Sequence, residues 1–348
     1  MRFNHFSIAV LLGLSFLVSC KPDVPETPVT PSIGKGVFVL NEGTFSFANA
    51  SLTFYDSEAD TVANNIFYRV NGSPLGDVGQ SLFLMDNKLY VVVNNSNYIY
   101  RVDATSLKYE AKVDDFYSPR NMCVVAPNKA YVSDIIGTGL WIINPMDMSH
   151  CGFVETGKST ESMLQLGNEL WVTNWSNYYQ PTTTNNTVQV VDIQNDVKVA
   201  EIEVGVEPNS MVVDKNGMVW VLCSCGWETN HYQLCKINPM LKKVEKTYTI
   251  AGYYPSHLCI NPSGTQLYFI DGNICRMSID DETSFEPEFI VAEDRSFYNM
   301  TIDPSNGDIY VTDAKDYMQN GDVYRYSFDG VLLSNFTAGI IPSAMVLN

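Results

Sequence analysis

The sequence predicts an all-β fold, namely a seven-bladed β-propeller with four antiparallel strands in each blade. Three observations predict it. A short strand with an aromatic residue near its start recurs seven times, turn-forming residues separate this strand from its neighbours, and the last strand supplies what the first repeat lacks. The apolar spacing of a long helix is absent. We expect a single propeller domain over residues 34–348, because no second linker interrupts it.

Residues 1–19 are predicted to be a signal peptide. Residues 8–18 are almost continuously apolar, but a membrane-spanning helix needs about 20 such residues. Residues 17–20 read Leu-Val-Ser-Cys, which resembles a bacterial lipobox. This resemblance implies cleavage before Cys20 and acylation of that cysteine, with each buried CH₂ of the anchor contributing about 0.8 kcal/mol. The alternative is an ordinary signal peptide with an incidental cysteine.

Residues 20–33 are predicted to be a tether between the lipid and the folded domain. The segment contains four prolines and no large aromatic residue, and proline at this density favours an extended, semi-rigid chain. Asp23 and Glu26 form a weak acidic flank of the kind that directs surface display in Bacteroidota. We therefore expect a lipid-anchored protein of the outer membrane, displayed on the cell surface, with a periplasmic orientation as the alternative.

The charge balance is strongly acidic, with 39 Asp and Glu against 21 Lys and Arg and a net charge of −18. Such a charge repels nucleic acid and anionic lipid, so nucleic acid is not an expected partner. Charged residues make up 17% of the chain and aromatic residues 12%. We expect a surface rich in uncharged polar and aromatic groups.

Seven cysteines remain after Cys20, and an odd number excludes a fully paired disulfide framework. Cys223 and Cys225 are too close in sequence for the usual zinc or redox spacing. Most of the cysteines are expected to be small buried hydrophobic residues. A disulfide from Cys223 or Cys225 to Cys235 is left open.

The recurring strand combines an aromatic residue, a valine or similar residue, and Asn or Asp near the end. Its aromatic positions are Phe38, Tyr90, Tyr131, Trp171, Trp220, Tyr268 and Tyr310, at spacings of 40 to 52 residues. Most copies follow a strand that starts polar and turns apolar, such as residues 209–213. Asn, Gly and Pro between these two strands are hairpin signals. Third and fourth strands follow, which gives the blade length and composition of a propeller.

The two ends of the repeat region complement each other. The first repeat has no leading strand, because Lys35-Gly36 runs straight into the aromatic strand, and residues 341–348 are a leading strand without followers. We expect this C-terminal strand to close blade one and to protect both sheet edges. An open solenoid would not need such matching half-blades.

These strands resemble the YVTN repeat of bacterial surface propellers, most closely at residues 171–174 and 310–313. Val93 and Cys223 depart from the repeat by replacing its Asn or Asp. Residues 37–56 also resemble a group of Bacteroidota lipoproteins, of which the cobalamin-capturing BtuG lipoproteins are the best-known example. The resemblance implies a surface lipoprotein that binds a bulky nutrient, with cobalamin as the leading candidate, and delivers it to a TonB-dependent transporter. Cobalamin would be a bound ligand and not a catalytic cofactor.

The start of each leading strand and the end of each aromatic strand must lie on the same rim of the propeller, because the two strands are antiparallel. Polar strand starts and long aromatic loops therefore gather around the mouth of the central channel. Exposed aromatic residues on a rigid scaffold favour ligand recognition over simple packing among loops. The predicted ligand-binding residues are Phe45, Phe47, Gln80, Arg120, Asn121, Glu161, Trp175, Tyr178, Tyr179, Asn209, Trp227, His231, His257, Tyr298, Asn299 and Tyr317.

Two other functions compete with ligand capture. Glu161, Asp134, Asp271 and Asp313 offer carboxylate pairs for a hydrolase or lyase. However, a residue that ends most of the repeats is more typical of a turn cap than of catalysis at one blade. His231 and His257 lack a third ligand, so no metal site and no cofactor are predicted. The last alternative is a scaffold that docks a protein through the same rim.

Overall fold

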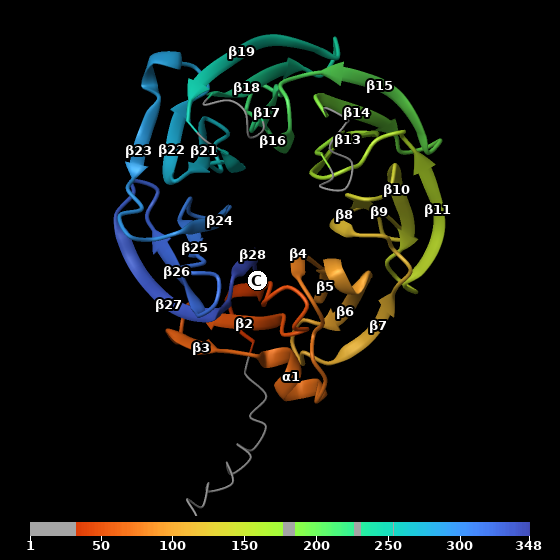
Figure 1. Ribbon diagram of the computed structural model, residues 1–348, viewed down its shortest axis with the longest axis vertical. Helices are drawn as coiled ribbons and strands as arrows, with labels where there is room; N and C mark the ends of the chain where they lie inside the picture. The colour runs from red at the N-terminus through yellow and green to blue at the C-terminus, as the bar shows by residue number, and fades with distance from the viewer. Residues whose placement is uncertain (1–32, 177–184, 226–230, 253) are drawn as a thin grey trace, which may run out of the picture.

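The computed structural model describes residues 33–176, 185–225, 231–252 and 254–348. Over these residues the chain forms seven four-stranded antiparallel sheets, arranged as blades around a central axis (Figure 1). The predicted seven-bladed propeller is therefore confirmed. Within the described ranges, no helix is long and apolar enough to cross a membrane.

The strands of each blade follow one another from the central axis outward. Blade 1 consists of β28 (Pro342–Leu347), β1 (Gly36–Asn41), β2 (Ser51–Asp56) and β3 (Thr61–Ala63). Blade 2 consists of β4 (Gly79–Met85), β5 (Lys88–Val93), β6 (Tyr98–Asp103) and β7 (Tyr109–Val113). Blade 3 consists of β8 (Pro119–Ala126), β9 (Lys129–Asp134), β10 (Gly139–Asn144) and β11 (Ser149–Glu155). Blade 4 consists of β12 (Met163–Leu166), β13 (Glu169–Thr173), β14 (Thr187–Asp192) and β15 (Val197–Glu203).

The remaining three blades have the same pattern. Blade 5 consists of β16 (Pro208–Val213), β17 (Val219–Cys223), β18 (His231–Asn238) and β19 (Lys243–Ala251). Blade 6 consists of β20 (Ser256–Ile260), β21 (Gln266–Asp271), β22 (Asn273–Ser278) and β23 (Glu286–Ile290). Blade 7 consists of β24 (Phe297–Ile302), β25 (Ile309–Asp313), β26 (Asn320–Tyr326) and β27 (Leu332–Ile340).

Three short helical segments join strands in the described part of the chain. They are α1 (Ile66–Asn71), η1 (Asn94–Ser96) and η2 (Glu282–Ser284). The helix α1 has no counterpart in the sequence prediction. It follows β3 and buries Ile66 and Phe67 in the hydrophobic cluster between blades 1 and 2.

The recurring aromatic residue holds neighbouring blades together. Each seam between two blades has its own hydrophobic cluster in the described part of the chain, and each cluster contains a different one of the seven aromatic residues. Trp171 and Trp220 are fully buried and pack against the next blade. The repeat is therefore a packing requirement, since every blade needs one large side chain to fill the space to its neighbour.

The two ends of the described chain meet in blade 1. The strand β28 pairs antiparallel with β1, and Asn348 N donates to the Gly36 carbonyl at 2.9 Å. This pairing confirms the predicted closure of blade one by the C-terminal strand. It leaves β1 with a partner on both sides.

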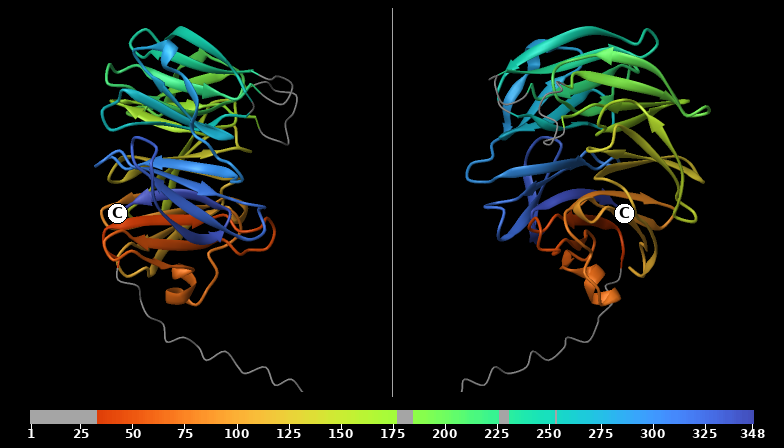
Figure 2. Two further views of the ribbon diagram at one scale, coloured as in Figure 1. Left: turned by 90° about the vertical axis from the view of Figure 1, so that its left-hand side faces the viewer. Right: turned by 45° about the vertical axis from the view of Figure 1, so that its right-hand side comes forward.

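The ring has two rims, seen from the side in Figure 2. We call the rim on which the innermost strands begin the mouth rim. The aromatic strands end on this rim, because each is antiparallel to its innermost strand. Gly36, at the start of β1, therefore lies on the opposite rim.

Candidate functional site

The predicted residues at the starts of the innermost strands sit in irregularities of the sheet. The pairing register shifts between Gly79 and Ser81 in β4, between Pro119 and Met122 in β8, and between Phe297 and Met300 in β24. Similar shifts occur in β16 and β20. The residues inside these shifts are Gln80, Arg120, Asn121, Asn209, His257, Leu258, Tyr298 and Asn299. A β-bulge changes the direction in which a side chain points. The side chains of these residues therefore depart from the regular alternation of the strands at the channel mouth.

A hydroxyl from the repeated motif stabilises two of these strand starts, and also the residue before β12 (Ser162). Ser133 Oγ accepts from Asn121 N at 3.0 Å, and Thr312 Oγ1 accepts from Asn299 N at 2.9 Å. Thr173 Oγ1 accepts from Ser162 N at 3.0 Å. The Ser or Thr of the aromatic strand thus supplies the partner that the irregular backbone needs.

Arg120 is the centre of a polar cluster that joins three blades. Its Nε donates to Glu161 Oε2 at 2.7 Å and its Nη2 donates to Glu161 Oε1 at 3.0 Å. Its Nη1 donates to Gln80 Oε1 at 2.5 Å. The Trp175 ring centroid lies 5.8 Å from the guanidinium carbon, within range of a cation–π contact. The Arg120 and Glu161 side chains are only 17% and 10% exposed, so this is a largely buried, two-point ion pair.

A second cluster lies where blades 7 and 1 meet. The Tyr298 hydroxyl donates to Glu42 Oε1 at 2.9 Å, and the Tyr298 ring contacts the Tyr317 ring edge-on at 5.8 Å between centroids. Burial raises the pKa of Glu42 above its usual range, although the Tyr298 hydrogen bond and the positive charge of Arg120 act in the opposite direction. Sequence reasoning did not select Glu42, because its hydrogen-bond partner Tyr298 is 256 positions away in the chain.

His257 and Asn209 occupy the mouth at blades 6 and 5. His257 Nδ1 lies 2.9 Å from Ser256 Oγ, and Asn209 Nδ2 donates to the Pro255 carbonyl at 2.7 Å. Burial lowers the pKa of His257 to about 4, and the charge of Arg120 adds to this effect. His257 is therefore neutral at neutral pH, while His231 is exposed at the start of β18, the third strand of its blade.

The loop after β1 presents two exposed aromatic side chains on a fixed backbone. Phe45 is 64% exposed and Phe47 is 72% exposed. The buried carboxylate of Asp77 accepts from Ser46 N at 2.9 and 3.1 Å, and Thr44 O accepts from Phe47 N at 3.0 Å. Tyr317 is 46% exposed. Tyr178, Tyr179 and Trp227 lie outside the described residues.

Sequence reasoning missed one aromatic residue of the mouth rim. Tyr117 precedes β8, is 58% exposed, and lies 5.5 Å from the Trp141 ring. The prediction rested on the loops after the aromatic strands, whereas Tyr117 belongs to a connection between blades. The sequence pattern that could have identified Tyr117 is an aromatic residue shortly before a strand that begins with polar residues.

The repeated Asn or Asp caps turns, as predicted. Asp134 accepts from the backbone N–H groups of Tyr117, Ser118, Ile136 and Gly137 at 2.8 to 3.0 Å. Asp313 Oδ1 accepts from Ser296 N at 2.8 Å and from Lys315 N at 2.9 Å. Among the carboxylates considered for hydrolase chemistry, Glu161, Asp134 and Asp313 thus have structural partners.

The cysteines near Cys223 form no disulfide among the described residues. Cys223, Cys225 and Cys235 are free thiols. Cys223 and Cys235 are buried in the cluster between blades 4 and 5, where they pack as small hydrophobic residues.

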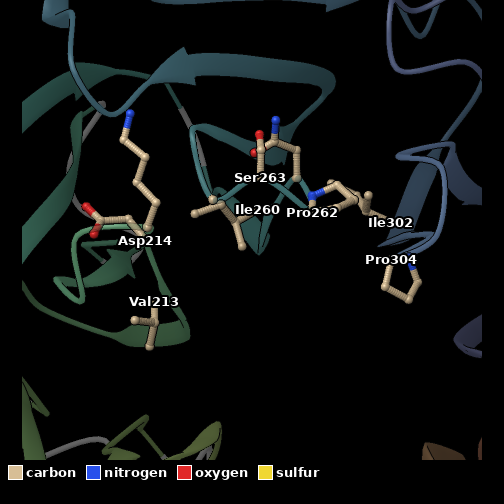
Figure 3. A pocket seen from close by; sticks show the side chains of 10 residues that line it. Val213, Asp214, Ile260, Pro262, Ser263, Ile302 and Pro304 are labelled. Atoms are coloured by element: carbon tan, nitrogen blue, oxygen red, sulfur yellow. The ribbon is translucent and has the colours of Figure 1, made fainter.

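A pocket of about 410 Å³ lies on the opposite rim, between the first hairpins of blades 5, 6 and 7 (Figure 3). Its polar groups already have partners. Asp214 accepts from Asn216 N, Met218 N and Trp220 Nε1, and Asn261 Oδ1 accepts from Thr265 N and Gln266 N. This pocket is a junction of capped turns and offers little for recognition.

Comparison with known proteins shows the fold more clearly than the function. Residues 35–340 match a family described as "Domain of unknown function (DUF5074)". No curated protein sequence matches the chain. The crystal structure of a quinonprotein alcohol dehydrogenase-like protein from Bacteroides thetaiotaomicron is 18% identical, with a TM-score of 0.69 over 90% of this chain and 78% of that chain.

Two further solved structures are similar to the chain. Kuenenia stuttgartiensis hydrazine synthase is 14% identical, with a TM-score of 0.62 over 76% of this chain and 88% of that chain. A functionally unknown protein from Desulfotomaculum acetoxidans is 12% identical, with a TM-score of 0.57 over 74% and 81% of the two chains. At these identities the likeness concerns the propeller fold alone.

Proposed function

Because the chain belongs to the DUF5074 family, a domain of unknown function, we propose its function from the geometry of the channel mouth. The protein is an exported, lipid-anchored binding protein. It captures a bulky, neutral, polar ligand on the mouth rim and passes it to an outer-membrane transporter of the TonB-dependent type.

The observation that carries this proposal is the Arg120–Glu161–Gln80 cluster. A buried ion pair contributes little to stability when compared with apolar packing of the same volume. The ion pair lies at the mouth, where the start of β8 departs from regular strand pairing. This position favours a role in ligand recognition over a role in stabilising the fold. The pair neutralises itself, so this cluster adds no net charge to the mouth and suits a neutral ligand.

The position of the chain start supports the proposed anchoring. The strand β1 runs from Gly36 on the opposite rim to Asn41 on the mouth rim. A lipid attached at Cys20 would be connected to the domain at Gly36, on the opposite rim. The mouth would then face away from the membrane, where a ligand can reach it.

Cobalamin is the leading candidate ligand. It is large and rich in amide groups, and the mouth offers amide, hydroxyl and aromatic side chains such as Asn121, Tyr298 and Trp175. The resemblance of residues 37–56 to cobalamin-capturing lipoproteins supports the same choice. We propose binding without turnover, since Glu161, Asp134 and Asp313 are engaged in structural contacts.

Calorimetry with cobalamin tests this proposal. The protein would lack residues 1–19 and carry Cys20→Ala, which makes it free of lipid. We expect binding at micromolar concentrations, weakened at least tenfold by Arg120→Ala. Absence of heat and of any tryptophan fluorescence change would reject cobalamin as the ligand.

A protein-docking function is the second candidate, and Phe45 and Phe47 favour it. Two exposed aromatic side chains on a fixed loop are typical of an interface anchor. This function predicts that a partner protein co-purifies with the wild type and is lost with Phe45→Ala/Phe47→Ala, while no small molecule binds.

A further inference from the structure

We infer that a second ligand site, separate from the channel mouth, lies at the outer edge of the mouth rim and binds a neutral, hydroxyl-rich ligand, namely a segment of a saccharide chain. The site is a pocket of about 400 Å³ at the seam of blades 7 and 1. This volume falls within the range of small-molecule sites. Its walls come from the loop before β2, the segment around α1, and the ends of β26 and β27.

The lining of this pocket is uncharged. Its residues are alanines, asparagines, a serine, a tyrosine, a proline, a glycine and an isoleucine, in a chain whose net charge is −18. No lysine, arginine, histidine, aspartate or glutamate lines it among the described residues. The pocket therefore gives no compensation to a charged ligand, which would lose hydration on entering.

The four asparagines of this pocket have hydrogen-bonding groups to spare. Asn64 has the fewest, because its Oδ1 accepts from Thr53 Oγ1 at 2.7 Å and its Nδ2 donates one N–H to Thr337 O at 3.2 Å. Asn49 uses only Oδ1, which accepts from Thr44 N at 2.7 Å. The side chains of Asn65 and Asn320 have no protein partner among the described residues. An amide offers two N–H donors and one carbonyl acceptor, which matches hydroxyl groups that both donate and accept.

Tyr68 adds an aromatic face to these amides. It lies on α1 and is 50% exposed, so much of its ring is open to solvent at the pocket. Ala48, Ala50 and Ala338 complete a low apolar surface beside it. A flat ring beside fixed amides suits a sugar ring, whose C–H face is apolar and whose edge carries hydroxyls.

The pocket is also built on a fixed backbone. Ala48 and Asn65 have φ values of 53° and 54°, in the left-handed region that few residues other than glycine adopt. Ala50 N donates to Gly76 O at 3.0 Å and holds the loop in this conformation. A Cβ on Gly339 would lie 2.7 Å from Asn41 Cγ and from Ser51 Oγ, so the close approach of this wall needs glycine.

Saccharide titrations test the inference. Maltotriose, cellotriose and triacetylchitotriose would be titrated into the lipid-free protein and followed by saturation-transfer NMR, with trigalacturonate as the charged comparison. We expect at least one neutral trisaccharide to bind and trigalacturonate not to bind. Tyr68→Ala and Asn320→Ala should each weaken binding about fivefold or more, the size expected for loss of one neutral contact.

Tyr117→Ala is the matched control, since Tyr117 is similarly exposed on the same rim but does not line this pocket. It should leave saccharide binding unchanged. Asn320 is exposed, so Asn320→Ala keeps the test valid if Tyr68→Ala fails to fold. Failure of all three neutral trisaccharides to bind would overturn the inference, as would wild-type binding by both pocket variants or equal binding of trigalacturonate. Arg120→Ala should retain saccharide binding, which separates this result from the proposed capture of cobalamin.

Discussion

The guanidinium of Arg120 in blade 3 binds the carboxylate of Glu161 in blade 4 at two points, with N–O distances of 2.7 and 3.0 Å. Gln80 in blade 2 accepts a third N–H, so one arginine connects three consecutive blades at the mouth. A change to the surface of the channel mouth at this point is therefore also a change to the contacts between blades.

Loss of Glu161 should destabilise the protein more than loss of an exposed ion pair. Glu161→Ala leaves Arg120 largely buried and unpaired, and we expect a loss of roughly 2–3 kcal/mol in the free energy of unfolding. Lys215→Ala, which breaks the exposed pair with Asp280, should change it by less than about 1 kcal/mol. Urea denaturation measures both. Equal losses would mean that channel water solvates Arg120 as well as bulk solvent does.

Tryptophans in the seams and at the mouth should behave differently. Trp171→Ala and Trp220→Ala each remove a fully buried side chain from the space between blades and should destabilise the fold by about 3–5 kcal/mol. Trp175→Ala should have a much smaller effect on stability and should weaken ligand binding by about 2 kcal/mol. Thermal unfolding and cobalamin titration of each variant distinguish the tryptophans between blades from Trp175 at the mouth. If all three changes lowered stability equally, Trp175 would be a packing residue.

His257 should make the stability of the protein depend on pH. Its pKa is lowered to about 4 in the folded state, against an ordinary value of 6.5, so the unfolded chain binds the proton more tightly. The contribution of the neutral His257 side chain to the free energy of unfolding is fully present above pH 6.5. It falls by up to about 3 kcal/mol as the pH is lowered toward 4. The difference in unfolding free energy between the wild type and His257→Asn should shrink over this window. Asparagine tolerates the positive φ of 57° at this position. A constant difference from pH 7 to pH 4 would contradict the prediction.

Asp77 should control the order of the loop that carries Phe45 and Phe47. Its carboxylate accepts from Ser46 N and from Asn95 Nδ2, so Asp77→Ala removes the fixed point of the loop. We expect the Ser46 amide to exchange hydrogen at least tenfold faster, while amides of the distant strand β17 keep their protection. Exchange followed by NMR measures both sites in one experiment. Unchanged exchange at Ser46 would show that the turn at Thr44 alone holds the loop.

The sequence predicted the fold well because its signals are local and repeated. The aromatic residue of each repeat fills one seam, so seven copies predict seven seams without knowledge of the contacts themselves. The turn-capping role of Asp134 and Asp313 could be predicted for the same reason, since a residue repeated at the end of a strand meets the same backbone each time. The closure by β28 followed from an incomplete first repeat.

The contacts of the candidate site could be predicted only in part, because they join residues far apart in the chain. Gln80, Arg120 and Glu161 were each selected as polar strand starts, but their mutual pairing depends on which strands bulge and by how much. The Tyr298–Glu42 contact crosses the closing seam, where no local pattern indicates a partner. The short helix α1 and the pocket beside it arise from a connection that no other blade repeats in the described part of the chain.

The pairing of β28 with β1 also determines how the protein unfolds. A linear stack of repeats frays from its terminal units, because each has a neighbour on one side only. In this ring the first and last segments share one sheet, so every blade has two neighbours and no unit is terminal. Releasing one blade breaks two seams at once. The pairing of β28 with β1 therefore joins the seven hydrophobic clusters between the blades into one unit that unfolds cooperatively.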